Sequence, residues 1–218
     1  MPTLPEEIVL LALDEKAGTL MLLPERSLDF ALAGAMMIEL SMRGKLETVD
    51  DVFLKVSSRE PTNDKILDDA LQIIPDTPHL TIENALARIA RKGGAWVDRL
   101  FDSLVEKEIL ERREDRFLWI VRESTFSLKD HKLLDNLRLH IRGAVMSEGE
   151  ELAASDAALI ALMDACKISF TIFSDKELAK YSKRFDEISK INPIARAVSL
   201  AISEIENAIL EVIAFTGV

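Results

Sequence analysis

Cysteine is almost absent from this 218-residue sequence, which contains only Cys166. A single cysteine excludes an intramolecular disulfide framework and a thiolate zinc cluster, and it indicates a reducing, cytoplasmic setting. Cys166 follows Leu159, Leu162 and Met163 on one apolar helix face, and no histidine lies near it in sequence. We therefore predict a buried structural thiol rather than a catalytic nucleophile.

Histidine is also scarce, and the three histidines are too scattered to suggest a metal site. His131 and His140 do not have the spacing that places two ligands on one helix face, so we expect solvent-exposed histidines. The sequence also lacks a phosphate-binding glycine loop, an H-E-x-x-H pair and a G-x-S-x-G turn. We predict no metal, no cofactor and no enzymatic activity.

Adjacent carboxylates are common but do not indicate catalysis. They occur at 6–7, 50–51, 68–69 and 150–151. A catalytic pair needs one buried carboxyl group whose pKa differs from that of its neighbour, and the sequence gives no sign of such burial. We expect these residues to lie on solvated faces and at helix starts, with the pair at 6–7 in the first turn of a helix over 5–13.

Basic residues are outnumbered, 27 against 38 acidic residues, and the formal net charge is -11. This charge opposes non-specific attraction to nucleic acid or to an anionic bilayer, so any such binding requires a local basic patch. The sequence has no run of about twenty apolar residues, and its start lacks the basic-then-apolar order of a signal peptide. We expect a soluble protein that is not secreted by that route.

The strongest pattern that is present lies at 28–56. Leu32, Met36 and Leu40 recur at helical spacing, the turn at 43–45 ends the helix, and the apolar residues then alternate as in a hairpin. A helix that presents its apolar face to a hairpin builds a core. We expect this segment to organise the fold.

The same construction recurs further along the chain. The matching pairs, all separated by the same interval, are Leu40 and Leu104, Leu46 and Leu110, Glu47 and Glu111, Asp51 and Asp115, Phe53 and Phe117, Leu54 and Leu118, and Val56 and Ile120. We interpret this as a helix–hairpin unit used twice. Coincidence is the alternative, since both segments consist of common residues.

Most of the remaining sequence is predicted to be helical, and a hydrophobic content of 48% is enough for one full core. Ser27 is expected to cap the central helix, and the glycine pair at 93–94 to separate two helices. A last helix, capped by Asn192, carries a continuous apolar stripe over 194–213, which is typical of a core helix in a bundle. We predict a mainly α fold with one domain over 1–218.

The second hairpin contains the first of two basic clusters. Arg112, Arg113, Arg116 and Arg122 lie in or beside it, as in the wing of a winged-helix nucleic-acid binder. Acidic residues are interleaved with these arginines, so a hairpin with internal salt bridges is the favoured alternative.

A membrane contact through the same hairpin is a further option. Strand alternation places Phe117 and Trp119 on one face and Leu118 and Ile120 on the other, so one of the two pairs would insert into the lipid. The sequence does not decide which pair is buried.

The second basic cluster, Arg88, Arg91 and Lys92, comes at the end of a predicted helix, just before the glycine pair. Cations in a last helical turn ordinarily stabilise the helix dipole. The functional alternative is that they hold a phosphate together with the start of the next helix.

Four segments resemble the Golgi phosphoprotein 3 family: EEIVLLAL, LAGAMMIELSMRGKL, VFLKVSSREPTNDKILDDAL and SLVEKEIL, in the family's order and at similar intervals. The resemblance covers roughly 5–121. It implies a mainly α, single domain in which a helical bundle is surrounded by further helices, with one or two β-hairpins. Glu108 stands where the family pattern has a glycine, so a less strained or differently shaped turn is expected there.

The resemblance also implies a function. Family members are non-enzymatic, peripheral Golgi proteins that bind phosphatidylinositol 4-phosphate and cytosolic tails of glycosyltransferases, and their exposed hairpin assists membrane contact and self-association. The expected function is an adaptor on the cytosolic face of a membrane, with an anionic lipid or phosphoinositide and other proteins as partners. The alternatives are a winged-helix-like, nucleic-acid-binding regulator that uses the hairpin at 111–122, and a structural oligomer without a lipid ligand.

The family's head-group ligands, one tryptophan and three arginines, are not retained in this sequence. Their positions fall on Pro24, Ala33, Gly94 and Val97. No arginine–phosphate contact carries over, because none of these residues is a cation. Missing ligands on a retained scaffold indicate a distant member of the family, with a bacterial origin as one option.

Cations close to these positions are the candidate substitutes. Arg26 comes two residues after Pro24, and Arg91 and Lys92 come shortly before Gly94. We predict that Arg26, Arg91 and Lys92 bind the lipid head group. For the hairpin, the candidates for membrane contact are Arg112, Arg113, Arg116, Phe117, Leu118 and Trp119.

Overall fold

The structure is a computed structural model that describes residues 1–113, 116–117, 120–121, 124–147 and 152–216. The helices are α1 (Leu4–Leu11), α2 (Ser27–Met42), α3 (Lys65–Ile73), α4 (Ile82–Ala90), α5 (Gly93–Glu106), α6 (His131–Met146), α7 (Ala154–Ala165), the 3₁₀ helix η1 (Ile168–Thr171), α8 (Asp175–Ser189) and α9 (Pro193–Thr216).

The strands of the described residues are short and form antiparallel pairs. These pairs are β1 (Leu13–Asp14) with β2 (Thr19–Leu20), β3 (Leu46–Val49) with β4 (Phe53–Val56), β5 (Leu110–Arg113) with β8 (Thr125–Leu128), and β6 (Arg116–Phe117) with β7 (Ile120–Val121). The predicted mainly α fold with β-hairpins is confirmed.

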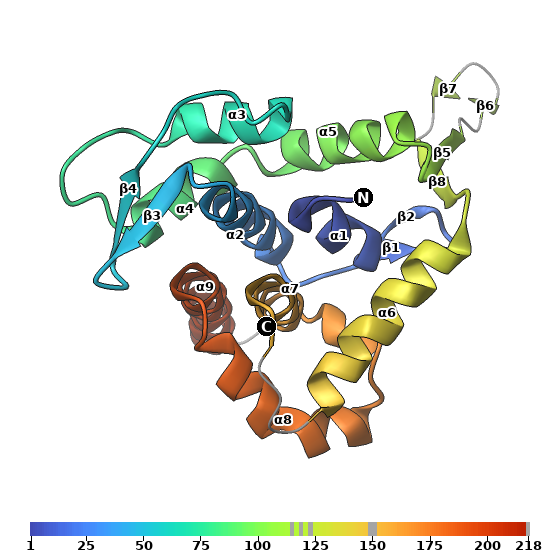
Figure 1. Ribbon diagram of the computed structural model, residues 1–218. Helices are drawn as coiled ribbons and strands as arrows, with labels where there is room; N and C mark the ends of the chain where they lie inside the picture. Colours follow the sequence, from blue (N-terminus) through green and yellow to red (C-terminus); the bar gives the residue numbers. More distant parts are fainter. Residues whose placement is uncertain (114–115, 118–119, 122–123, 148–151, 217–218) are drawn as a thin grey trace.

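Helix α2 is the centre of the fold. It contacts α1, α3, α4, α5, α7 and α9, whereas α6 and α8 pack outside this group, on α7 and on each other (Figure 1). Its residues Leu32, Met36, Met37 and Leu40 are fully buried. The predicted bundle surrounded by further helices is therefore confirmed, and the segment at 28–56 does organise it.

A glycine allows the neighbouring helices to approach α2 closely. A Cβ atom at Gly34 would lie 2.4 Å from Cγ2 of Val198 on α9 and 3.1 Å from Cδ2 of Leu162 on α7. Real Cβ atoms do not approach other atoms this closely, so any larger side chain would push these helices apart.

The start of α2 differs from the prediction. Ser27 is the first helical residue rather than the N-cap, and it is fully buried. Its hydroxyl donates to the carbonyl oxygen of Pro24 at 2.7 Å, so the side chain closes the preceding turn and caps no helix. The N-cap is Arg26, whose φ of 58° lies in the left-handed region.

The break between two helices that was predicted at the glycine pair 93–94 lies two residues earlier. Helix α4 ends at Ala90 and α5 begins at Gly93, so only Arg91 and Lys92 connect them. Both connecting residues have right-handed helical φ and ψ angles, and the glycines form the first turn of α5. Two helices are thus separated as predicted, but the break falls at Arg91 and Lys92 rather than at the glycines.

The predicted repeat is correct for the helix ends. Gly44 follows α2 with φ 67°, and Glu108 follows α5 with φ 58°. The amide of Lys45 donates to the carbonyl of Leu40 at 2.9 Å. The amide of Ile109 likewise donates to the carbonyl of Leu104 at 2.9 Å. Both helices thus end in the same Schellman-type turn, and the expectation of a different turn at Glu108 is wrong.

The repeat fails for the returning strands. Strand β4 pairs with β3 and starts at Phe53, but Phe117 belongs to β6, and the partner of β5 is β8, which begins only at Thr125. The second hairpin is therefore much longer than the first. Its outer strands β6 and β7 extend away from the helical body (Figure 1).

The apolar stripe of α9 is buried at its start and is exposed at 209–210. Ile194, Val198 and Ile202 are buried, whereas Ile209 is 36% exposed and Leu210 is 62% exposed. The predicted Asn192 cap is confirmed, because its Oδ1 accepts from the amides of the residues two and three positions later. Burial therefore decreases along the helix from Ile202 to Leu210, which a periodic pattern alone does not reveal.

The acidic pair in α1 is not a solvated face. Glu6 is only 1% exposed, and Glu7 is half-buried. The capping box between Thr3 and Glu6 does confirm the predicted helix start. Glu6 is buried because Lys107 and Ser103, from α5 and the turn after it, donate to its carboxylate.

The scarce residue types behave as predicted. Cys166 is fully buried, its thiol donates to the carbonyl of Leu162, and burial raises its pKa to about 12. His131 and His140 are exposed and His79 lies on the surface. In the described part of the chain, no helix combines the length and the hydropathy that a membrane span requires.

Candidate functional site

Arg26 is one of three exposed cations near the contact of α2 with α5. Its guanidinium lies 3.6 Å from the carboxylate of Asp29 and 5.3 Å from the ring centroid of Phe30. The left-handed backbone at Arg26 ends the loop before α2 and starts the helix. The loop and the helix therefore place the Arg26 side chain at the N-terminal end of α2.

Arg91 and Lys92 come from the connection between α4 and α5. The Lys92 ammonium lies 5.7 Å from the ring centroid of Trp96, a buried residue whose indole N–H donates to the carbonyl of Ile89. The Arg91 side chain is exposed and forms no hydrogen bond or ion pair with any described residue. The buried indole thus fixes the connection and leaves both cations on the surface.

Asp29 joins these two segments. A Cβ atom at Gly93 would lie 2.4 Å from Oδ1 of Asp29, so the carboxylate rests directly on the first residue of α5. Burial raises the pKa of Asp29, and the nearby Arg26 opposes this rise. We call Arg26, Arg91 and Lys92 the basic corner, because the Asp29–Gly93 contact brings them to one end of α2 and α5.

The basic corner has a small positive charge in a strongly acidic protein. Its three cations are accompanied by two carboxylates, those of Asp29 and the exposed Glu25, so the local net charge is about +1. The role of Asp29 was missed from the sequence. No sequence pattern predicts that this residue meets a glycine in a helix far along the chain.

The four positions that correspond to the family's head-group ligands do not form a polar pocket. Ala33 is fully buried in α2, Gly94 is exposed with open space above it, and Pro24 and Val97 are half-buried. Gly94 and Pro24 lie next to the basic corner along the chain. An anion at the N-terminal end of α5 would therefore contact the cations of the basic corner, and not the residues at these four family positions.

The hairpin after α5 contains the other predicted residues. Arg112 forms an ion pair with Asp102 and lies 5.3 Å from the ring centroid of Phe126, and Arg113 is exposed. This ion pair joins the hairpin to α5, so it does not test the predicted salt bridges within the hairpin. Arg116 and Phe117 form strand β6, but their side chains, and Leu118 and Trp119 entirely, lie outside the described residues.

The two candidate regions lie along one edge of the molecule. The basic corner is at the start of α5, and the hairpin follows its end (Figure 1). A helix of this length spans about 20 Å. A flat membrane surface that lies along α5 would therefore contact both the basic corner and the hairpin.

Comparisons with known proteins agree with the architecture. The family model described as Golgi phosphoprotein 3 matches residues 4–205. Vacuolar protein sorting-associated protein 74 from Eremothecium gossypii is 27% identical over 172 residues, which cover 69% of this chain and 51% of that protein. The protein of the same name from Schizosaccharomyces pombe is 24% identical over 172 residues, covering 69% of this chain and 50% of its own. The chain thus spans about half the length of these relatives.

Proposed function

Because the chain belongs to the Golgi phosphoprotein 3 family, we propose that it is a non-enzymatic adaptor that binds the anionic cytosolic surface of a membrane, with phosphatidylinositol 4-phosphate as its preferred lipid. The name of the two relatives associates them with protein sorting, so we propose other proteins as further partners of this chain. We also propose that residues 1–218 form one functional domain.

The observation that supports the proposal is the basic corner. Its three cations are exposed, and the buried Trp96 and the Asp29–Gly93 contact fix the backbone that presents them. The start of α5 adds the positive end of a helix dipole, which favours a phosphate group. Each lysine or arginine near an anionic membrane contributes about 1 kcal/mol to binding.

Vesicle co-sedimentation tests this proposal. The vesicles consist of phosphatidylcholine alone, with phosphatidylserine, or with phosphatidylinositol 4-phosphate, the last two matched for total charge. The test variant is Arg26→Ala, Arg91→Ala, Lys92→Ala. The control is Lys176→Ala, Lys183→Ala, Lys190→Ala, which changes the net charge equally but on α8 and at its C-cap, at the other side of the molecule (Figure 1).

We expect the wild type and the α8 variant to bind anionic vesicles, and the basic-corner variant to partition at least about tenfold less. Stronger retention by phosphatidylinositol 4-phosphate than by phosphatidylserine supports the head-group preference, and equal retention refutes it. Equal loss in the two triple variants, or no binding of the wild type to anionic vesicles, refutes the basic corner as the membrane site.

A further inference from the structure

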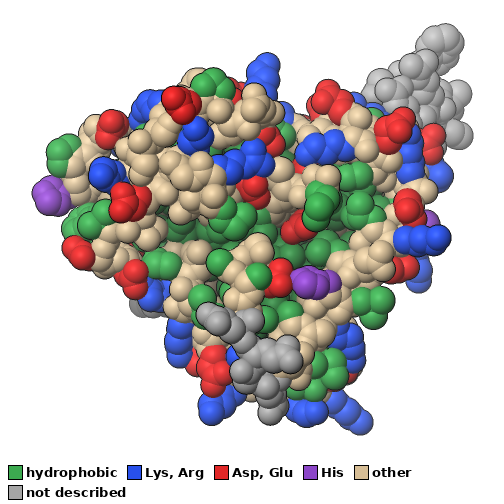
Figure 2. All heavy atoms as spheres, in the orientation of Figure 1, with side chains coloured by type: hydrophobic (Ala, Val, Ile, Leu, Met, Phe, Trp, Pro, Cys, Tyr) green, Lys and Arg blue, Asp and Glu red, His purple; other side chains and the backbone are tan. Residues whose placement is uncertain are grey.

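A groove lies between helix α6 and the edge of α1 and α2, beside α7, on a face that does not include the basic corner. Its volume is about 910 Å³, within the range of about 300–1,000 Å³ that is usual for small-molecule sites. Hydrophobic side chains gather in this hollow, with acidic and histidine side chains beside them (Figure 2). The large apolar residues that line it are Leu4, Met42, Leu133, Leu137 and Leu159.

Two of the carboxylates in the groove already have partners. Glu39 accepts from the Arg43 guanidinium at 2.8 and 2.9 Å and from the amide of Leu4 at 3.1 Å. Asp156 lies 2.9 Å from Nε2 of His140. Both carboxylates therefore have polar partners within the protein.

Glu7 is different. Its side chain lines the groove, is half-buried, and forms no hydrogen bond or ion pair with any described residue. Burial raises its pKa to about 7, and the neighbouring Glu39 and Asp156 contribute to this rise, while His140 opposes them. Among the residues described so far, no cation therefore pairs with the Glu7 carboxyl group.

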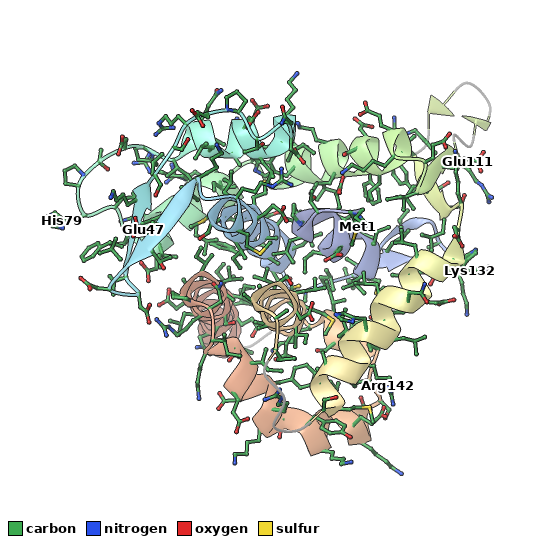
Figure 3. The ribbon with its side chains drawn as sticks, in the orientation of Figure 1. Met1, Glu47, His79, Glu111, Lys132 and Arg142 are labelled. Carbon is green, nitrogen blue, oxygen red and sulfur yellow. The ribbon has the colours of Figure 1, made fainter. Side chains whose placement is uncertain are left out.

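The remaining charged groups at the groove do not form an ion pair with Glu7 either. Asp130 is the N-cap of α6 and accepts from the amide of Lys132. Lys132, labelled at the start of α6 in Figure 3, forms no ion pair with Glu7. Met1, also labelled there, lines the mouth without an ion pair to Glu7.

We propose that this groove binds a small amphiphilic amine, in which a protonated primary amine at the end of an aliphatic chain pairs with Glu7 and the chain packs along Leu133, Leu137 and Leu159. A charge-assisted hydrogen bond from the ammonium would give the carboxylate its missing partner. The apolar side chains would cover the aliphatic part, at roughly 25 cal/mol per Å² of buried surface.

The walls of the groove favour such a ligand over an extended peptide. All lining residues except Met1, Pro2 and Asp130 belong to α1, α2, α6 and α7, whose backbone groups mostly bond within the helices. An extended peptide needs backbone partners such as a strand edge, and these walls have none. An amphiphilic amine needs one strong polar partner and an apolar surface, and the groove has both.

Isothermal titration of the full chain with n-octylamine tests the proposal. n-Octanol has the same chain without the charge, and ethylamine has the charge without the chain. The main variant is Glu7→Gln, which keeps the shape of the side chain. Its matched control is Glu106→Gln, an exposed residue at the end of α5. A second variant, Leu137→Ser, removes part of the apolar wall, and thermal melting verifies that each variant is folded.

We expect saturable binding of one n-octylamine per chain, with affinity about tenfold lower in Glu7→Gln, several-fold lower in Leu137→Ser and unchanged in Glu106→Gln. Octanol and ethylamine should both bind at least tenfold more weakly than n-octylamine. Equal binding of octanol, or unchanged binding in Glu7→Gln, overturns the proposal. Tighter binding of a lysine-containing apolar peptide also overturns it. These residues are separate from the basic corner, so failure here leaves the vesicle result unaffected.

Discussion

Glu6 and Glu7 are adjacent in α1, yet their carboxylates lie in opposite electrostatic environments. Burial tends to raise the pKa of Glu6, but Nζ of Lys107 donates to both carboxylate oxygens at 2.6 and 2.7 Å, and the pKa lies below its usual value. Glu7 has no such donor, and its pKa rises to about 7. Glu6 therefore stabilises the fold, whereas Glu7 presents an unpaired carboxyl group to the groove.

Glu6→Gln should lower the free energy of unfolding by about 2 kcal/mol at pH 7, because a buried charge-assisted interaction is lost. Chemical denaturation measures this, with the exposed Glu106→Gln as control, expected within about 0.5 kcal/mol of the wild type. A lowered pKa gives stability that is present above the unfolded pKa and is lost as the pH falls through the folded one. The difference between wild type and variant should therefore shrink in acid; a constant difference contradicts this assignment.

Glu7→Gln should have the opposite effect. The pKa of this carboxyl group is near its ordinary value of 4.5 in the unfolded chain and about 7 in the folded one. Its contribution to stability is therefore present below pH 4.5 and is lost as the pH rises to about 7. At pH 8 the variant should be more stable than the wild type by about 1 kcal/mol, after allowance for solvent screening. Denaturation at pH 5 should show almost no difference, and equal stability at both pH values would argue against a raised pKa.

Local sequence patterns predicted the parts of the fold that depend on nearby residues. The buried face of α2, the turn after α2 and the Asn192 cap all follow from periodicity or from one side chain bonded to a neighbouring amide. The strand partner of β5 did not, because a register set by residues far along the chain leaves no local signal.

The candidate sites depend even more on distant contacts. Arg26 and Lys92 could be selected as cations, but the carboxylate that links their segments is visible only once Asp29 meets Gly93. The burial of Glu6 likewise requires Lys107, whose relation to α1 comes from the packing of α5. Residue type suggested the chemistry, and only the fold could show which charges are paired.

Gly34→Ala should destabilise the protein by about 1–3 kcal/mol, because its new Cβ would overlap Val198 and push α9 away from α2. Gly143, in the interior of α6, is exposed, and a Cβ atom added there would have no other atom within 4 Å. Gly143→Ala should therefore raise stability by about 0.5–1 kcal/mol through helix propensity. Thermal melting distinguishes the two; a stabilised Gly34→Ala would show that α9 is not tightly packed on α2.

Glu108→Gly should stabilise the protein, because Glu108 adopts the left-handed conformation that Gly44 adopts in the equivalent turn. A non-glycine residue in this conformation costs about 1 kcal/mol, and the exposed ion pair of Glu108 with Lys129 offsets little of it. The reciprocal variant Gly44→Ala should lose about 1 kcal/mol. Urea denaturation of both variants measures these changes, and a destabilised Glu108→Gly would mean that the ion pair outweighs the backbone strain.

Asp29→Asn tests how far Asp29 masks the basic corner. The carboxylate lies 3.6 Å from the Arg26 guanidinium, and its removal would raise the local charge of the corner from about +1 to about +2. Binding to phosphatidylserine vesicles should strengthen about fivefold, since one unit of charge near an anionic surface contributes about 1 kcal/mol. The control Asp175→Asn makes the same change in net charge at the start of α8. Equal gains in both variants would assign the effect to overall charge, whereas a gain confined to Asp29→Asn places the membrane contact at the start of α5.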